Sequence, residues 1–436
     1  MKKLALVILI LAFPLVAAAG ELLIENARVF DGHRLLPDVG AVLVVGNKIA
    51  AMGDEAESEF SAGTRIDAKG ALLIPGLIDM HTHLMFSPGL VASRDEWDSF
   101  VLGGIATQHM QEKFLQRGFT SVRDIGGAST GLSHAVRAGL IEGPRIWSAG
   151  AALSGTSGHA DAGARTQPSG SKGKMHADGQ LVTVDGRAEV LNAVRTNFRR
   201  GAAFIKVMAS GGVATELDPL ESLGFTVREM EAAVEAANDY GSYVAAHAYD
   251  DAAVNRALDA GVKSIEHGFL MSEKTVKRMA REGAYFSWQA FASIVLFADV
   301  ENVPNFSEVS KAKARKIYAN AENVLGWLKK HEVKVVGGSD LFSIPIIDRV
   351  IDDVVVKQKY FSAIEVLRMH TSIAGELLAL SGPKNPYIEA RIGVLEPGAW
   401  ADLLLVQGEL LEDLNVLLDA DNVRLIVKNG QVYKSL

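Results

Sequence analysis

The sequence contains no cysteine, so disulfides and thiolate metal sites are both excluded. Any bound metal must be held by histidine, carboxylate or a less usual ligand. An excess of positive charge is also lacking, because the formal net charge is -8, and this argues against a nucleic-acid partner. What the chain has is length and apolar content. With 436 residues, 48% of them hydrophobic, it can bury one large core and a smaller second lobe.

The N-terminus has the pattern of a secretory signal peptide. Two lysines form a basic start, residues 4–16 are apolar, and a run of three alanines ends at Ala19. The apolar stretch is too short for a comfortable membrane span, although an uncleaved anchor is the alternative. No cysteine follows the cleavage site, so a lipid-anchored form is excluded. We expect residues 1–19 to be removed and the protein to be exported, to the periplasm, with no membrane attachment after cleavage.

The middle of the chain alternates strand-like and helix-like segments. The strand candidates are apolar and often β-branched, and they lie at 72–83, 119–125, 144–150, 202–211, 243–249, 264–268, 285–289 and 333–340. Helix-period stretches lie between most of them, as at 226–241 and 250–261. Strands that alternate with helices imply a parallel sheet. Eight such units over roughly 300 residues predict an α/β fold, a (β/α)8 TIM-like barrel.

The two chain ends have a different character. Residues 20–70 and 391–436 contain short strands with glycine-containing and Asn-Lys turns, and neither end could easily bury a core alone. We expect them to form one small β-sandwich, with the catalytic barrel, residues 71–390, inserted between its halves. Two long polar or glycine-rich loops stand out within the barrel, at 154–180 and 213–225.

Ionisable residues gather at the predicted carboxyl ends of the strands, where active sites of this fold lie. The stretch LIDMHTHL ends the first strand with two histidines one residue apart, and in a strand both side chains point to the same face. A lone histidine at a strand end is more often structural. Four histidines with an aspartate and a lysine favour a shared metal centre. The full set is His81, His83, Lys206, His247, His267 and Asp340.

Lys206 lies within the apolar segment AAFIKVMAS. An ammonium buried there without a partner would be costly. A salt bridge is one remedy. Reaction of the amine with carbon dioxide is another, because the resulting carbamate is an anionic oxygen ligand that could bridge two cations about 3.5–4 Å apart. Nitrogen and oxygen ligands suit zinc, with manganese or iron as further candidates.

The ordered segments PGLIDMHTH, FIKV, AAHAY, SIEHG and GGSD resemble the amidohydrolase superfamily of metal-dependent hydrolases. The segments NARVFDG, LEPGAWADLLLV and IVKNGQVY at the two ends resemble it too, so the match covers nearly the whole chain after residue 19. The resemblance implies two divalent metal ions, with zinc as the expected metal. It assigns His81, His83 and Asp340 to one ion, His247 and His267 to the other, and a carbamylated Lys206 as the bridge. Imidazolonepropionases resemble the chain in places but lack the bridging lysine.

The expected mechanism follows from these charges. Two cations lower the pKa of a shared water, so that hydroxide forms near neutral pH, and one of them polarises the scissile carbonyl. Asp340 is expected to take the proton and pass it to the leaving nitrogen. A role as a pure metal ligand is the alternative for Asp340.

Two further residues are expected to bind substrate. By strand parity Tyr249 shares the face of His247, toward the barrel mouth, and His159 lies in the loop segment SGTSGHAD. The chain resembles the Xaa-Pro dipeptidase and carboxypeptidase-like branch of the superfamily, whose Gly-His and HAY motifs are associated with the α-carboxylate of the substrate. The resemblance implies a small-molecule substrate with a free carboxylate, a dipeptide or an N-acyl amino acid. Barrel packing of Tyr249 and a loop hydrogen bond of His159 are the alternatives.

The apolar loops at 290–300 and 341–347 predict a bulky apolar or aromatic group on the substrate, as in ochratoxin-like amides, unless they pack against barrel helices. Two other functions stay open. One is a cyclic-amide hydrolase, such as a lactam or imidazolone hydrolase, on the same metal centre, and the other is an inactive metal-binding protein. Related enzymes are often homo-oligomers, so an oligomer is expected. Arg123 and Asp124 could touch substrate or pair with each other, and the sequence assigns them no role.

Overall fold

The computed structural model of the protein describes residues 20–86, 99–164, 166–168, 170–303, 306–341 and 346–435. The signal peptide predicted at 1–19 lies outside these residues, as do residues 342–345 of the predicted apolar loop 341–347. Within the described ranges, no helix has both the length and the apolar character needed to cross a membrane.

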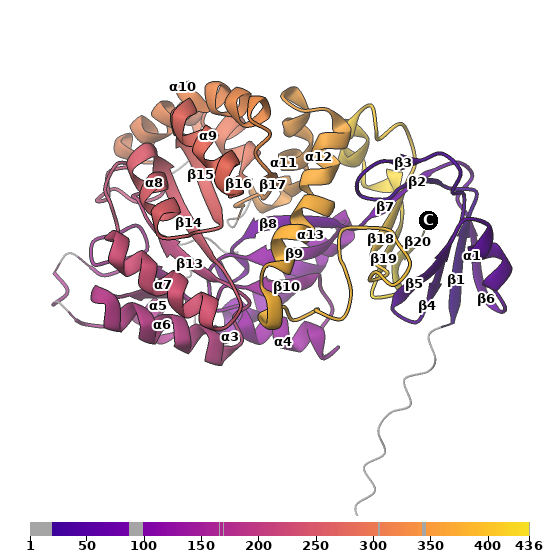
Figure 1. The fold of residues 1–436 in the computed structure, drawn as a ribbon, viewed down its shortest axis with the longest axis horizontal. Coiled ribbons are helices and arrows are strands. Elements are labelled where there is room, and N and C mark those ends of the chain that lie inside the picture. The colour runs from indigo at the N-terminus through magenta and orange to yellow at the C-terminus, as the bar shows by residue number, and fades with distance from the viewer. Residues whose placement is uncertain are drawn as a thin grey trace, which may run out of the picture.

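Parallel strands form the centre of the molecule (Figure 1). They make two hydrogen-bonded sheets, with the orders β10-β9-β8 and β12-β11-β13-β14-β15-β16-β17. Every pairing within them is parallel, which confirms the α/β class with parallel strands. The strands are β8 (Leu77–Thr82), β9 (Phe119–Asp124), β10 (Arg145–Ser148), β11 (Ala152–Ser154), β12 (Leu181–Thr183), β13 (Ile205–Met208), β14 (Val244–Asp250), β15 (Ser264–Leu270), β16 (Tyr285–Trp288) and β17 (Val335–Gly337).

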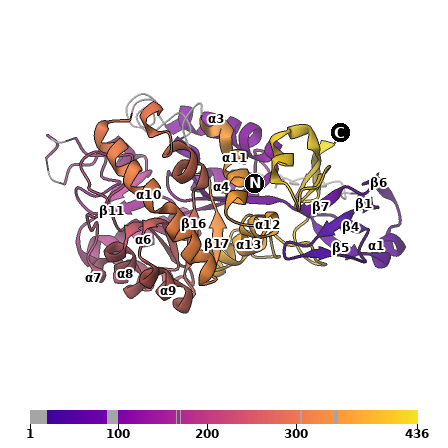
Figure 2. The ribbon, with the colours of Figure 1, turned by 90° about the horizontal axis from the view of Figure 1, so that it is seen from above.

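Helices lie along the outside of these strands, as the two views in Figures 1 and 2 show. The predicted helices at 226–241 and 250–261 are α7 and α8. A capping box begins α7, because Thr226 and Glu229 each accept a hydrogen bond from the other's backbone amide. The helices are α1 (Asp54–Glu59), α3 (Ser99–His109), α4 (Thr130–Arg137), α5 (Lys174–Ala177), α6 (Gly186–Arg200), α7 (Val227–Asp239), α8 (Asp251–Asp259), α9 (Glu273–Glu282), α10 (Glu308–Lys330), α11 (Val350–Val356), α12 (Ala363–Met369) and α13 (Ser372–Ala379).

Closure of the strands into a (β/α)8 barrel stays a prediction. The two parallel sheets are separate, and single backbone hydrogen bonds link them where β17 approaches β8 and where β13 approaches β10. The amide of Asp340 donates to the carbonyl of His81 at 2.8 Å, and the amide of Ala203 donates to the carbonyl of Ser148 at 2.7 Å. Strands β11 and β12, on either side of the predicted loop 154–180, were not predicted. Each has three residues, too few for an alternating pattern to show in the sequence.

The single strand predicted at 72–83 is two strands that separate at Gly76. Before it, β7 (Leu72–Pro75) pairs with β18 (Leu403–Val406), and after it β8 pairs with β9. A Cβ atom at Gly76 would lie 2.1 Å from the hydroxyl oxygen of Thr120, so the close passage there requires glycine. The chain therefore leaves one sheet and enters another within a single apolar run.

Strands from both chain ends share one six-stranded sheet, with the order β20-β19-β18-β7-β2-β3. A four-stranded sheet, β5-β4-β1-β6, lies beside it at the right of Figure 1. One buried apolar cluster includes Ile24 and Val44 from the smaller sheet and Leu73, Leu403 and Leu425 from the larger. The domain boundaries 20–70, 71–390 and 391–436 stay predictions. The remaining strands are β1 (Glu21–Glu25), β2 (Arg28–Phe30), β3 (Leu35–Leu36), β4 (Val42–Val45), β5 (Lys48–Met52), β6 (Gly63–Asp67), β19 (Val423–Lys428) and β20 (Gln431–Ser435).

Candidate active site

Three of the predicted site residues have ligand atoms close enough together to hold a metal ion. The imidazoles of His81 and His267 and the carboxylate of Asp340 offer atoms that all lie within 4.8 Å of one another. They come from β8, β15 and the segment after β17. The Oδ1 atom of Asp340 lies 3.6 Å from Nε2 of His81 and 3.4 Å from Nε2 of His83. His81 and His83 therefore face the same carboxylate.

Two of these residues have an unusual backbone conformation. His267 has φ of 75° and Asp340 has φ of 55°. A non-glycine residue in this region costs about 1–3 kcal/mol, and such residues cluster at functional sites. In a regular strand Glu266 and His267 would point to opposite faces. Here the Glu266 carboxylate lies 2.9 Å from Nδ1 of His81, while the ring centroids of His267 and His81 are 5.1 Å apart. The positive φ of His267 turns both side chains toward the same centre.

A second group of rings adjoins this centre. The ring centroid of His247 lies 4.5 Å from that of His267 and 5.1 Å from that of Tyr249. His159, from the loop after β11, stacks on His247 with centroids 4.4 Å apart and planes 20° apart. The two predicted substrate-binding residues thus lie next to predicted metal ligands.

Lys206 is buried on β13, with 1% of its surface exposed. In the strand register it lies beside Ala245, two residues before the pairing of Met208 with His247. Burial lowers the pKa of Lys206 to about 8, with Arg123 adding to the shift and Glu266 opposing it. Among the residues whose positions are described, no carboxylate oxygen lies within 4.0 Å of its amine, so the salt bridge considered from the sequence is not found there.

Burial keeps most of the imidazoles neutral, the form that binds metals. It lowers the pKa of His81 to about 4 and holds the pKa of His247 and His267 well below the usual range. Burial acts in the same direction on His83, but the hydrogen bond and charge of Asp340 outweigh it and raise the pKa of His83. Burial would raise the pKa of Asp340, yet the nearby imidazoles hold that pKa below the usual carboxyl range. Asp340 is therefore an ionised carboxylate.

One nitrogen of each of three imidazoles is held by a protein acceptor. Nδ1 of His81 contacts Glu266 at 2.9 Å, Nδ1 of His83 contacts the carbonyl of Gly126 at 3.0 Å, and Nε2 of His247 contacts the carbonyl of Gly211 at 3.0 Å. These acceptors make the contacted nitrogen the protonated one and direct the other nitrogen to a different partner. Such anchoring is typical of metal-binding histidines, so the donor set fits a divalent cation.

A buried ion pair that the sequence did not predict supports His81. Arg123 donates to both carboxylate oxygens of Glu266, at 2.8 and 2.9 Å, and both side chains are fully buried. Arg123 and Asp124 do not pair with each other. The Asp124 carboxylate accepts hydrogen bonds from the amide of Leu84 and the hydroxyl of Ser129. The sequence signal for Glu266 is its place beside His267, although in a regular strand these two neighbours would point to opposite faces.

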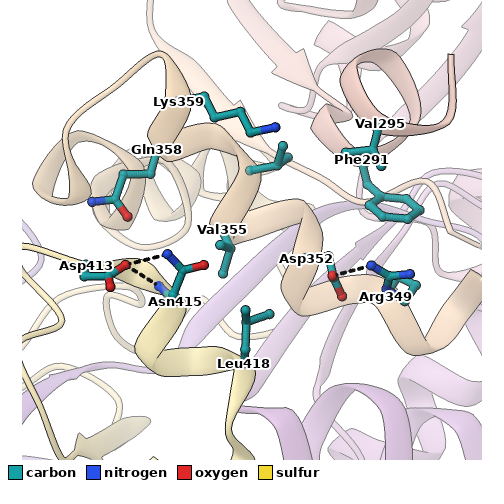
Figure 3. A pocket seen from close by; sticks show the side chains of 11 residues that line it. Phe291, Val295, Arg349, Asp352, Val355, Gln358, Lys359, Asp413, Asn415 and Leu418 are labelled. Atoms are coloured by element: carbon teal, nitrogen blue, oxygen red, sulfur yellow. Dashed lines mark hydrogen bonds and ion pairs between the residues drawn. The ribbon is translucent and has the colours of Figure 1, made fainter. Parts of the chain in front are cut away.

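A separate pocket of about 480 Å³ lies between α11, the π-helix η4 (Phe291–Leu296) and the 3-10 helix η9 (Leu414–Leu418) (Figure 3). None of the eight predicted site residues lines it. Arg349 and Asp352 both line this pocket and form an ion pair with each other. From the predicted apolar loop 290–300, Phe291 and Val295 face this pocket, and Phe291 and Ile294 belong to the main core cluster. The pocket is thus distinct from the candidate active site.

Comparisons with known proteins agree with this geometry. Residues 72–433 match the amidohydrolase family. Ochratoxinase from Aspergillus niger is 29% identical over 415 residues, which cover 90% of this chain and 83% of that protein. The crystal structure of a prolidase complexed with N-methylphosphonate-L-proline is 30% identical, with a TM-score of 0.85 over 95% of this chain and 100% of that chain. A Xaa-Pro dipeptidase with methionine bound in its active site is 28% identical, with a TM-score of 0.81 over the same shares. The chain therefore belongs to the amidohydrolase family and is a hydrolase that acts on amide bonds.

Proposed function

We propose that this protein is a binuclear metal-dependent amidohydrolase that cleaves the amide bond to a C-terminal amino acid. The observation that carries the proposal is the cluster of His81, His267 and Asp340, together with the buried Lys206 on β13. Its substrates are dipeptides and N-acyl amino acids. The similarity to a prolidase and a Xaa-Pro dipeptidase supports the peptide-like class, and the similarity to an ochratoxinase supports a bulky aromatic group on the substrate.

In this proposal His81, His83 and Asp340 hold one divalent ion and His247 and His267 hold the other. A carbamate on Lys206 would supply anionic oxygen ligands to both ions, and zinc is the expected metal. The lowered pKa of Lys206 supports the carbamate, because only the neutral amine adds carbon dioxide. When bound, such cations lower the pKa of water and polarise a carbonyl group.

Asp340 is the proposed proton carrier. Its side chain is 21% exposed, whereas that of His81 is 2% exposed, so a substrate can reach the carboxylate. As an ionised carboxylate, Asp340 can accept the proton of the attacking water. It then delivers that proton to the leaving nitrogen.

His159 and Tyr249 are the proposed binding residues for the substrate carboxylate. Burial raises the pKa of Tyr249, so its hydroxyl keeps its proton and can donate to an anion. The stacking of His159 on His247 brings the imidazole next to a proposed metal ligand. Export to the periplasm is a further proposal and rests on the sequence pattern of residues 1–19 alone.

The test is a substrate panel with metal content measured on the same sample. The panel holds Xaa-Pro dipeptides, N-acyl amino acids with Phe, Leu, Lys or Arg as the leaving group, and cyclic amides. We expect hydrolysis of the linear acids, preference for Phe and Leu, and two ions per chain. Asp340→Asn should abolish turnover, while Asp259→Asn, at a half-exposed ion pair, should leave it unchanged. Hydrolysis of cyclic amides alone, or one ion per chain in fully active enzyme, would overturn the proposal.

A further inference from the structure

Lys313 uses its whole hydrogen-bonding capacity on one loop. It lies on α10, is 9% exposed, and reaches the segment after β13. Its ammonium donates to the main-chain carbonyls of Gly212 at 2.8 Å, Thr215 at 2.6 Å and Asp218 at 2.7 Å. An ammonium has three N–H donors, so all of them are engaged. Lys313 therefore joins α10 to residues 211–218, which we call the 211–218 loop.

The same loop holds the imidazole of His159. Nδ1 of His159 lies 2.8 Å from the Asp218 carboxylate and 2.8 Å from the Thr215 hydroxyl. The Asp218 carboxylate also accepts the amide of Gly212 at 2.8 Å, which closes the loop on itself. Because a carboxylate faces it, Nδ1 is the protonated nitrogen, and Nε2 is the atom left to meet a ligand.

The loop also contacts His247. The carbonyl of Gly211 accepts a hydrogen bond from Nε2 of His247, and His159 stacks on the same ring. A Cβ atom at Gly212 would lie 2.1 Å from Cε1 of His159, so the loop backbone packs directly against that imidazole. A shift of the loop would therefore move His159 as well.

Besides Lys313, the loop is held by Val213, which belongs to the main buried core cluster, and by its contacts with His159 and His247. Residues 211–218 lie outside every helix and strand, and Leu217 is 59% exposed. The carboxylate of Asp218 lies 3.9 Å from the Lys313 ammonium, which adds a charge attraction to the three hydrogen bonds. Lys313 thus adds three hydrogen bonds and one charge attraction to the contacts that hold the loop.

We propose that Lys313 is a positioning residue for substrate-carboxylate binding. By holding the 211–218 loop, it keeps His159 in the orientation and tautomer that meet the carboxylate. The inference rests on the proposed role of His159, and it predicts that Lys313 sets the preference for free acids over their amides without touching the reacting atoms.

The test compares Lys313→Met with Lys311→Met, a lysine on the same helix whose contacts are with Glu301 and Glu308 at the surface. Each protein is given an N-acyl amino acid and its C-terminal carboxamide. We expect Lys313→Met to raise KM for the acid about tenfold to hundredfold, the effect of one charge-assisted hydrogen bond, with kcat nearly unchanged. The carboxamide kinetics and the Lys311→Met kinetics should stay within about twofold of the unmodified enzyme.

A second readout needs no substrate. In 15N-histidine-labelled protein, the His159 resonances, assigned with His159→Gln, should report a protonated Nδ1, and Lys313→Met should give a mixture of tautomers. An unchanged His159 spectrum would overturn the inference whatever the kinetics. The two readouts can also disagree. If the His159 spectrum changes but every protein cleaves the acid and the carboxamide equally well, the positioning role of Lys313 is supported. The proposed role of His159 in binding the carboxylate is then overturned. If Lys313→Met does not fold, Lys313→Arg must retain the His159 signal, and its loss there would overturn the inference.

Discussion

Replacing Glu266 with glutamine removes one negative charge from the buried contact between Arg123 and His81 and keeps the size of the side chain. In the protein the carboxylate accepts two hydrogen bonds from Arg123, one from the hydroxyl of Ser264 at 2.6 Å, and lies 2.9 Å from Nδ1 of His81. Burial would raise the pKa of Glu266, but Arg123 and His81 hold it well below the usual range. The surroundings of Glu266 therefore stabilise its negatively charged carboxylate.

Two effects of Glu266→Gln can be estimated. Arg123 would be left as a buried charge without its partner, which destabilises a protein by about 3–5 kcal/mol. The glutamine amide would also place an N–H donor against Arg123 or against Nδ1 of His81, so the tautomer of His81 would no longer be held. Loss of such a contact behind a metal ligand costs about 10–100-fold in metal affinity.

The matched control is Glu235→Gln. Glu235 pairs with Arg187 at 2.6 Å, but both side chains are half exposed, and exposed pairs contribute only about 0.2–1 kcal/mol. Urea denaturation of the metal-free proteins measures the first effect, and zinc titration against a chelator measures the second. The double variant Arg123→Met with Glu266→Gln should regain most of the lost stability but not the zinc affinity. Equal stability of Glu266→Gln and Glu235→Gln, or unchanged zinc affinity of Glu266→Gln, would refute the reasoning.

Three further predictions follow from the same site. Lys206→Met should lower kcat by at least about a thousandfold and reduce bound metal below two ions per chain, because the proposed bridging anion would be lost; metal analysis with turnover on one sample checks this, and two retained ions would contradict it. Tyr249→Phe should raise KM for free acids about tenfold and leave their carboxamides unaffected, which steady-state kinetics on both substrates would show. Metal-free protein should lose stability as pH falls from 6.5 toward about 4, because His81 is neutral in the fold and takes up its proton only on unfolding. The loss is about 1.4 kcal/mol per pH unit for each such imidazole, and coincident urea midpoints at pH 7 and pH 5 would argue against it.

Short-range patterns predicted the features that depend on neighbours in the chain. Alternation along a strand placed His81 and His83 on one face, and both lie near Asp340. The apolar periodicity of 226–241 predicted α7, and its first turn carries the capping residues Thr226 and Glu229. These features follow from backbone geometry and local hydrogen bonds, which act over a few residues.

The same rules failed where the backbone departs from regular geometry. Neighbouring residues of a regular strand point to opposite faces, but Glu266 and His267 both lie near His81, and His267 has a positive φ. A largely apolar segment predicted one strand at 72–83, and the close passage at Gly76 divides it between two sheets. In both cases tertiary contacts select a conformation that the local pattern does not favour.

The amino-acid sequence by itself determined the chemistry that is available here: imidazole, carboxylate and amine donors with no thiol, placed at the ends of apolar strands that alternate with helices. Only the tertiary structure decided which side chain or backbone group each buried charge contacts. Arg123 and Glu266 are 143 residues apart in the chain, and Lys313 lies 101 residues from Gly212. The physical reason is that burial makes an unpaired charge costly, so the fold must supply a partner, and that partner can come from any segment that packs close enough.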